Sequence, residues 1–212
     1  SAASDVYKRQ GLLVRKLQPA RHSPSSRWLI RSMAVDLFNR HFDFPVLLAI
    51  RDAFESGTWD GWMRAVTALG DHGAVWIALG VALLLFRRTR LTGAAILLAL
   101  TLVALVGNMG LKPLFDRLRP CDIMGFTLLP ACPPDPSFPS GHTAASFASA
   151  TVLWLRRSAF FRPALVLAAL IAFSRLYLFV HFPTDVMEGI LLGLCCAWCA
   201  ARGLEFIADR RR

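Results

Sequence analysis

The sequence contains little charge for its length. Asp, Glu, Lys and Arg make up 18% of its 212 residues, whereas hydrophobic residues make up 55% and the mean hydropathy is +0.48. Acidic residues are the scarcer sign, with 14 Asp and Glu against 24 Lys and Arg, and no internal repeat or low-complexity tract is present. A soluble domain of this length would be more polar, so the composition excludes that class and indicates an integral membrane protein of one domain.

The apolar residues are concentrated in blocks of about 20, the length of helix that crosses ~30 Å of hydrocarbon. The second block contains no charged residue, whereas the first carries Asp71 and His72 near its start, which make its outer end wet. We therefore predict an all-α fold, an integral membrane helical bundle of five to six transmembrane helices. The blocks cover residues 66–86, 91–111, 138–155, 163–180 and 184–206.

Residues 35–54 mix apolar side chains with charged ones. A helix crossing the bilayer here would bury several charges, at about 3 kcal/mol each near the centre. An amphipathic helix lying in the interface suits this segment better, and a first membrane span is the alternative. The charged residues are Asp36, Arg40, Asp43, Arg51 and Asp52.

Residues 1–32 differ from the rest, because they carry seven Lys and Arg against one Asp. We expect a non-native or disordered basic extension, with Met33 as a plausible native start, since residues 1–10 show no periodicity. A basic arm on the membrane surface is the alternative. We divide the remainder into an amphipathic interfacial helix or first span at residues 33–58 and a membrane-embedded domain at residues 59–212.

Clusters of arginine predict the orientation in the membrane. They occupy the loop after the first block, the loop after the third block and the C-terminal tail. In a chain of five spans these regions fall on one side, which the positive-inside rule makes cytoplasmic. The other side receives three polar clusters, which we therefore expect to share one site. The arginines are Arg87, Arg88, Arg90, Arg156, Arg157, Arg162, Arg202, Arg210, Arg211 and Arg212.

The first polar cluster follows the second block and contains Lys112 and Arg119, seven residues apart. The two cations would share a helix face if the helix continued through Pro113. Pro113 can instead open a new turn that Arg119 and Pro120 close, because a residue before proline avoids the α region. Taken alone, these cations also fit interfacial side chains that extend to lipid headgroups.

The second cluster, Pro139-Ser140-Gly141-His142, begins the third block. Ser140 is a good N-cap and Gly141 lets the backbone approach a ligand, so free N–H groups at a positive helix end can hold an anion. His142 then lies in the first turn, where it can give a proton to an oxygen leaving that anion. The alternative is a capped helix with a merely interfacial histidine.

In the third cluster, Ser174 and Arg175 follow an uncharged stretch, residues 163–173. An arginine within a span needs an anion or water, and phosphate fits its guanidinium group. Pro183 is expected to open the fifth helix, which places Asp185 in its first turn, four residues after His181. A carboxylate that fixes one ring nitrogen orients the other and raises its basicity, as a nucleophilic histidine requires. A capping pair at an interface is the alternative.

The combined pattern resembles the type 2 phosphatidic acid phosphatase family, which shares its site with the vanadium-dependent haloperoxidases. The pattern is Lys-x6-Arg-Pro, then Pro-Ser-Gly-His, then Ser-Arg-x5-His-x3-Asp, and it extends from Lys112 to Asp185. So many specified residues at fixed spacings are far more specific than one short motif. The apolar blocks from residue 66 to 206 also look like the core of the family, whereas residues 1–32 have no counterpart in it.

The resemblance implies a role for each residue of the clusters. His181 would attack phosphorus and form a phosphohistidine, Asp185 would orient it, and His142 would protonate the leaving oxygen and then activate water. No cofactor or metal is expected, because the side chains of the site are cations and no carboxylate cluster is available for magnesium. The residues that would hold the phosphoryl oxygens are Lys112, Arg119, Ser140, Gly141 and Arg175.

The five cysteines fall into two groups. Cys195, Cys196 and Cys199 lie in the last apolar block, where packing explains them. Cys121 and Cys132 lie in the Pro-rich loop between the first two polar clusters, on the predicted extracytoplasmic side. A disulfide between them, closing a short loop over the site, is a reasonable hypothesis for an oxidising compartment.

The resemblance implies a lipid phosphatase, and the arginine clusters place its active site on the extracytoplasmic side of the cytoplasmic membrane. Its expected partners are the lipid bilayer and a lipid phosphate or diphosphate, with no nucleic acid; the oligomeric state is not indicated. A small bacterial envelope protein with an outward site favours undecaprenyl diphosphate. Phosphatidic acid, phosphatidylglycerol phosphate and diacylglycerol diphosphate are the alternatives. A non-hydrolytic lipid-binding or lipid-transport protein on the same fold would need a broken site, and here every position is filled.

Overall fold

The computed structural model describes residues 39–54 and 57–210, and its regular secondary structure there is entirely helical. The predicted all-α class is thus confirmed. The expectation for residues 1–32 concerns a part of the chain outside these ranges. The helices are η1 (Asn39–Asp43), α3 (Phe44–Ala53), α4 (Asp60–Leu69), η2 (Asp71–Gly73), α5 (Ala74–Leu84), α6 (Arg90–Val103), η3 (Ala104–Leu111), α7 (Lys112–Phe115), α8 (Pro120–Met124), α9 (Gly141–Leu155), α10 (Phe161–Tyr177) and α11 (Pro183–Asp209).

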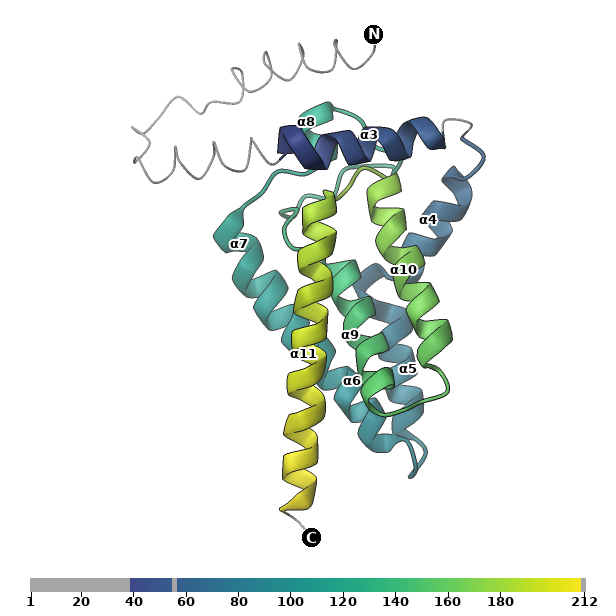
Figure 1. Cartoon of the computed structure of the whole chain (residues 1–212), viewed down its shortest axis with the longest axis vertical. Coiled ribbons are helices and arrows are strands. Elements are labelled where there is room, and N and C mark those ends of the chain that lie inside the picture. The colour runs from purple at the N-terminus through teal and green to yellow at the C-terminus, as the bar shows by residue number, and fades with distance from the viewer. Residues whose placement is uncertain (1–38, 55–56, 211–212) are drawn as a thin grey trace.

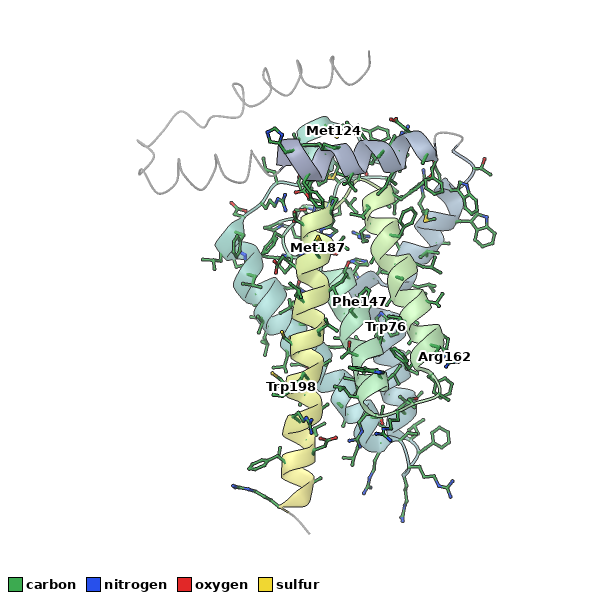
Figure 2. All side chains as sticks on the ribbon, viewed as in Figure 1. Trp76, Met124, Phe147, Arg162, Met187 and Trp198 are labelled. Carbon is green, nitrogen blue, oxygen red and sulfur yellow. A yellow bond between two sulfur atoms is a disulfide. The ribbon has the colours of Figure 1, made fainter. Side chains whose placement is uncertain are left out.

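The helices form an elongated bundle with α9 at its centre (Figure 1). α9 contacts α6, α10 and α11, and α5 packs beside α6. Small side chains fill its buried face, and Ser146 within it accepts a hydrogen bond of 2.9 Å from the indole Nε1 of the buried Trp76. The outer surface is apolar by contrast: Met187 and Trp198 project from α11 away from the bundle and are more than half exposed (Figure 2). This pattern is typical of a protein whose outer face contacts lipid.

Within residues 39–54 and 57–210, three helical stretches are long and apolar enough to cross a membrane: Asp60–Leu84, Arg90–Met124 and Pro183–Ala208. They include the first, second and fifth predicted spans. α9 and α10 run beside them but have only 15 and 17 residues. The length and apolar composition of these helices identify a membrane protein. The count of five to six spans stays a prediction.

The helix α3 lies across one end of the bundle instead of along it (Figure 1). Its 10 residues extend only about 15 Å, half the thickness of the hydrocarbon. Phe44 and Leu47 of α3 are buried against Phe179 and Phe182, which lie between α10 and α11. This placement suits an interfacial helix, and the choice between an interfacial helix and a first span stays a prediction, as do the domain boundaries at residues 33–58 and 59–212.

Glycines bring α11 into backbone contact with α9. A Cβ added at Gly189 would lie 2.8 Å from the Ser140 carbonyl oxygen, and one at Gly193 would lie 2.6 Å from the Ala144 carbonyl oxygen. The two glycines are four residues apart and so occupy the same face of α11. Small residues at this spacing allow membrane helices to approach closely. Since α9 begins with Gly141 and α11 carries Asp185, this contact sets the distance between the second and third polar clusters.

Replacing Gly193 by alanine is therefore expected to destabilise the bundle. The added methyl group would have to push α9 and α11 apart, and overpacking of this kind costs roughly 1–3 kcal/mol. Gly203→Ala is the matched control, because a Cβ at Gly203 meets nothing within 4 Å. Thermal unfolding in detergent should show a lower melting temperature for Gly193→Ala than for Gly203→Ala. Equal melting temperatures would contradict the close approach of the two helices.

Candidate active site

A cavity of about 830 Å³ contains most of the predicted site residues. Its polar lining comes from all three clusters, although they are far apart in the sequence. Ser140 and Asp185 do not line it; Ser140 is buried, and its hydroxyl group lies 2.9 Å from that of Thr143. The predicted residues that line the cavity are Lys112, Arg119, Gly141, His142, Arg175 and His181.

The first cluster is not one continuous helix. α7 ends at Phe115, and Asp116 adopts a left-handed conformation with a φ of 43°. Arg119 is the extended residue before α8, which Pro120 begins. The prediction that Arg119 and Pro120 close a turn opened at Pro113 is therefore wrong, because proline here starts a helix. Lys112 and Arg119 are joined through Asp135, with which both pair, and not by a shared helix face.

Helix starts position the other two clusters as expected. Ser140 is the N-cap of α9, and its hydroxyl oxygen accepts from the Thr143 N–H. Pro183 is the first residue of α11, and Asp185 accepts a hydrogen bond of 2.8 Å from the Phe182 N–H. Gly141 faces a crowded position, since a Cβ there would lie 3.2 Å from the amide oxygen of Asn108.

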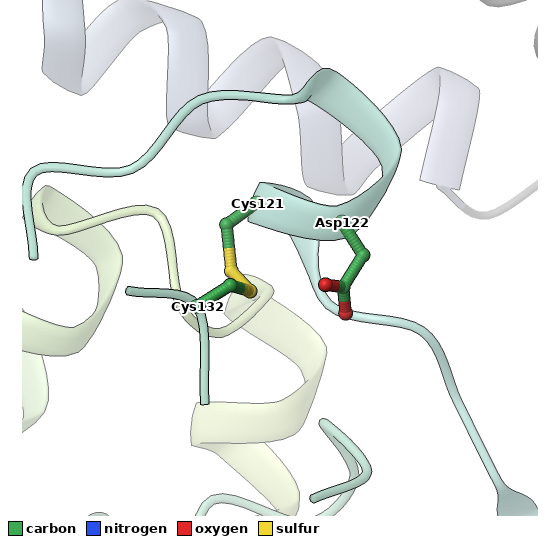
Figure 3. Close-up of side chains that lie close together, drawn as sticks. All are labelled: Cys121, Asp122 and Cys132. Carbon is green, nitrogen blue, oxygen red and sulfur yellow. A yellow bond between two sulfur atoms is a disulfide. The ribbon is translucent and has the colours of Figure 1, made fainter. Parts of the chain in front are cut away.

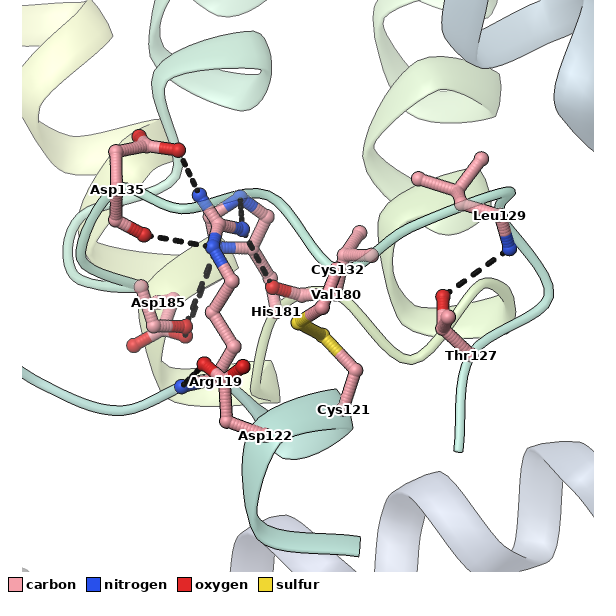
Figure 4. The surroundings of a disulfide bond; sticks show 11 residues. Arg119, Cys121, Asp122, Thr127, Leu129, Cys132, Asp135, Val180, His181 and Asp185 are labelled. Atoms are coloured by element: carbon pink, nitrogen blue, oxygen red, sulfur yellow. Dashed lines mark hydrogen bonds and ion pairs between the residues drawn. A yellow bond between two sulfur atoms is a disulfide. The ribbon is translucent and has the colours of Figure 1, made fainter. Parts of the chain in front are cut away.

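His181 lies between a carboxylate and a guanidinium group (Figure 4). Its Nδ1 lies 3.6 Å from Asp185 Oδ2 and 3.5 Å from the Ser137 hydroxyl, which itself donates to Asp185 at 2.5 Å. Its Nε2 lies 3.1 Å from an NH1 group of Arg119. Asp185 thus faces the expected nitrogen, but at more than hydrogen-bond distance, and Ser137 fills the gap. Sequence reasoning missed Ser137, which belongs to none of the three clusters.

The surroundings of His181 favour its neutral form. The imidazole is buried, and desolvation together with the nearby Arg119, Arg175 and Lys112 holds the pKa of His181 well below its ordinary value. A proton on Nδ1 facing Asp185 leaves the Nε2 lone pair directed toward the cations. A neutral imidazole with this orientation can act as a nucleophile.

Two acidic residues that sequence reasoning did not place in the site also line the cavity. Asp135 pairs with Lys112, and its Oδ1 accepts from Arg119 NH2 at 2.9 Å. Asp71 Oδ1 lies 2.9 Å from His142 Nε2. Asp71 could have been placed in the site from the sequence, because it is a charged residue near the start of an apolar block. Asp135 had no comparable signal, because it lies in a Pro-rich loop.

The carboxylate of Asp135 pairs with Lys112 and Arg119, the two cations of the first cluster that are predicted to hold a phosphate group. Burial alone would raise its pKa, but the hydrogen bond from Lys112 and the charge of Arg119 outweigh this effect and lower the pKa of Asp135 to about 2. The group is therefore an anion at any working pH. Arg175 is the third cation that lines the cavity. It is buried and donates to the Thr67 hydroxyl group, and its Nε has no hydrogen-bond partner among the described residues.

A disulfide restrains the chain just before Asp135, which lies three residues after Cys132. Cys121 in α8 and Cys132 are bonded, with their Cα atoms 6.0 Å apart (Figure 4). With Asp122, they form a group whose potential ligand atoms lie within 4.8 Å of one another (Figure 3). The two sulfur atoms bond each other, so this pair offers no thiolate to a metal.

Comparison with known proteins identifies the family. The profile of the PAP2 superfamily matches residues 92–207, more than half of the chain. The chain belongs to the PAP2 superfamily. The match covers all three polar clusters, and the predicted resemblance is confirmed.

Individual relatives of this PAP2 protein are phosphatases. An undecaprenyl-diphosphatase of Sulfolobus acidocaldarius is 35% identical over 138 residues, which cover 64% of this chain and 66% of that protein. A decaprenylphosphoryl-5-phosphoribose phosphatase of Mycolicibacterium smegmatis is 33% identical over 68% of this chain and 79% of its own length. These relatives support the predicted phosphoric ester hydrolase.

Solved structures agree with the fold. LpxE of Aquifex aeolicus superposes with a TM-score of 0.65 at 29% identity, over 76% of this chain and 94% of that one. A transmembrane PAP2-type phosphatidylglycerolphosphate phosphatase of Bacillus subtilis gives 0.62 at 26% identity, over 91% of this chain and all of the other.

The position of Asp135 predicts the effect of its removal. Asp135→Asn is expected to lower the inhibition constant of inorganic phosphate and the KM for a lipid phosphate by roughly two- to fivefold, because a half-exposed ion pair is worth up to about 1 kcal/mol. Asp116→Asn removes a charge from an exposed position outside the cavity and is the control. Initial rates at several phosphate concentrations would measure both constants. Weaker phosphate inhibition in Asp135→Asn would contradict this prediction. It would show that Asp135 keeps Lys112 and Arg119 in position for the substrate and does not compete with the substrate.

Proposed function

We propose that this PAP2 protein removes the terminal phosphate of an isoprenoid lipid diphosphate, with undecaprenyl diphosphate as the favoured substrate, through a phosphohistidine on His181. The observation that carries the proposal is the composition of the cavity. Its cations and histidines lie beside an apolar wall of Ile77 from α5 and Leu97 and Leu100 from α6. Such a cavity fits a phosphate group attached to a hydrocarbon chain.

In the first step, the Nε2 lone pair of His181 attacks the terminal phosphorus. The bond from phosphorus to the bridging oxygen breaks, and the lipid monophosphate leaves with a proton from His142. Lys112, Arg119 and Arg175 stabilise the charge on the phosphoryl oxygens in the transition state. Asp185 stabilises the positive imidazole that keeps its proton on Nδ1.

In the second step, His142 accepts a proton from water, whose oxygen attacks the phosphorus of the phosphohistidine. The phosphorus–nitrogen bond breaks, which releases inorganic phosphate and regenerates neutral His181. Asp71 holds His142 at 2.9 Å and supports both of its proton transfers. The relatives that act on undecaprenyl and decaprenyl lipids support the isoprenoid class of substrate.

His181→Ala is expected to reduce phosphate release from undecaprenyl diphosphate by at least about 10³-fold, because it removes the nucleophile. His41→Ala, an exposed histidine of η1, should leave the rate unchanged. Acid-labile, alkali-stable label from a terminally ³²P-labelled lipid should appear on wild type and not on His181→Ala. Equal rates in the two proteins would end the nucleophile assignment, and the rate on phosphatidic acid and phosphatidylglycerol phosphate tests the choice of lipid.

We also propose that the cavity opens on the extracytoplasmic side of the cytoplasmic membrane. Arg156 pairs with Glu205 of α11 at 2.9 Å, at the end of α9 remote from Gly141, so this arginine cluster and the cavity belong to opposite ends of the bundle. Positive loops favour the cytoplasm, and a disulfide favours an oxidising compartment.

Peptide mapping of protein taken from native membranes and alkylated without reduction tests this orientation. Cys121 and Cys132 should be recovered as one linked peptide, because oxidising conditions preserve their bond. Cys195 and Cys199, which are free and exposed on α11, serve as internal controls for alkylation. Recovery of Cys121 and Cys132 as free, alkylated thiols would contradict an oxidising location.

A further inference from the structure

Arg117 joins two fully buried carboxylates behind the active site. Its NH1 group donates to Asp185 Oδ1 at 2.5 Å, and its NH2 group donates to Asp43 Oδ2 at 2.6 Å. Both carboxylates have no exposed side-chain surface, and the side chain of Arg117 is 12% exposed. The guanidinium carbon also lies 4.2 Å from the ring centroid of Phe182, the residue after His181. Neither Arg117 nor Asp43 lines the cavity.

Asp43 also binds the start of α11. Its Oδ1 accepts from the Thr184 N–H at 3.0 Å, and its Oδ2 accepts from the Thr184 hydroxyl at 2.8 Å. The first N–H groups of a helix have no partner within the helix, so this carboxylate satisfies one of them. Asp43 thereby fixes the residue next to Asp185, and it does so from η1, at the membrane-surface end of the bundle.

We propose that Asp43 and Arg117 are positioning residues for catalysis, which keep Asp185 ionised and directed at His181. The proposal rests on the proposed role of His181 as the nucleophile. A buried carboxylate without a cation is costly and tends to take up a proton, which would remove its charge. Arg117 opposes this protonation, and it also fixes the oxygen that does not face His181.

Asp43 is needed because of the charge balance. Arg117 alone would neutralise Asp185 and leave no net charge to stabilise a positive His181. Two carboxylates around one guanidinium group leave one net negative charge, which faces the three cations of the cavity across the imidazole. Asp43 lies outside the residues matched by the family profile, which begin at residue 92. Through Asp43, η1 therefore contributes to the proposed catalytic apparatus, although it lies outside the matched residues.

The test is a double-mutant cycle on phosphate release from undecaprenyl diphosphate. Asp43→Asn and Arg117→Gln are each expected to lower kcat by about 10- to 100-fold, as for outer partners of other catalytic groups. The double variant should lose less than the product of the two single losses, because Asp43 and Arg117 share one ion pair. The inhibition constant of inorganic phosphate should change by less than about threefold, since the cavity cations are untouched.

Two further variants separate this role from a structural one. Asp52→Asn removes an exposed charge from α3 and should retain the wild-type kcat. Arg117→Lys keeps the charge but cannot bridge both carboxylates in the fork geometry of a guanidinium group, so its kcat should lie between those of wild type and Arg117→Gln. Melting temperatures in detergent identify variants that fail to fold, and Arg117→Lys then decides the question.

Several outcomes would overturn the proposal. Asp43→Asn with a wild-type kcat, losses that multiply in the double variant, or Arg117→Lys as impaired as Arg117→Gln would each do so. An inactive His181→Ala beside a fully active Asp43→Asn would refute only this proposal. An active His181→Ala would instead refute the proposed nucleophile.

Discussion

The constraint on which the site depends is the gathering of Lys112, Arg119 and Arg175 around one buried imidazole. Three cations in a medium of low dielectric repel one another strongly, so the fold must supply anions wherever substrate is absent. Asp135 supplies one on the cavity side, and the group of Asp43, Arg117 and Asp185 supplies a net negative charge behind His181. Burial and the three cations keep His181 neutral, which suits its proposed role as the nucleophile.

The helical packing serves this constraint. The glycine contact between α9 and α11 fixes the distance between His142 and His181, because each histidine lies beside the start of one of these helices. The disulfide restrains the loop that brings Asp135 to the cations. Chain segments from η1 to α11 therefore contribute to one electrostatic unit, although the family profile covers only the C-terminal part of the chain.

The membrane class, the helical fold and the three clusters could be predicted because each is local in the sequence. Ser140 as an N-cap and Pro183 as a helix start depend on neighbouring residues alone. The contacts of Asp135 with Lys112 and of Asp43 with Arg117 join residues 23 and 74 positions apart. No periodicity or spacing encodes such pairs. The error at Pro120 has a similar cause, since a proline can follow one helix or begin the next, and tertiary packing decides between them.

On the proposed reaction, charge also explains how one cavity can both accept a substrate and release a product. A terminal diphosphate carries more negative charge than the single carboxylate of Asp135, so it gains more from the three cations and displaces Asp135. The released inorganic phosphate carries less charge than the bound diphosphate and has no hydrocarbon chain to hold it along the apolar wall. Asp135, three residues after the disulfide-bonded Cys132, is present at high effective concentration and can compete for Lys112 and Arg119 again. The carboxylate that stabilises the empty site therefore also favours turnover, since it opposes retention of phosphate more than binding of the lipid.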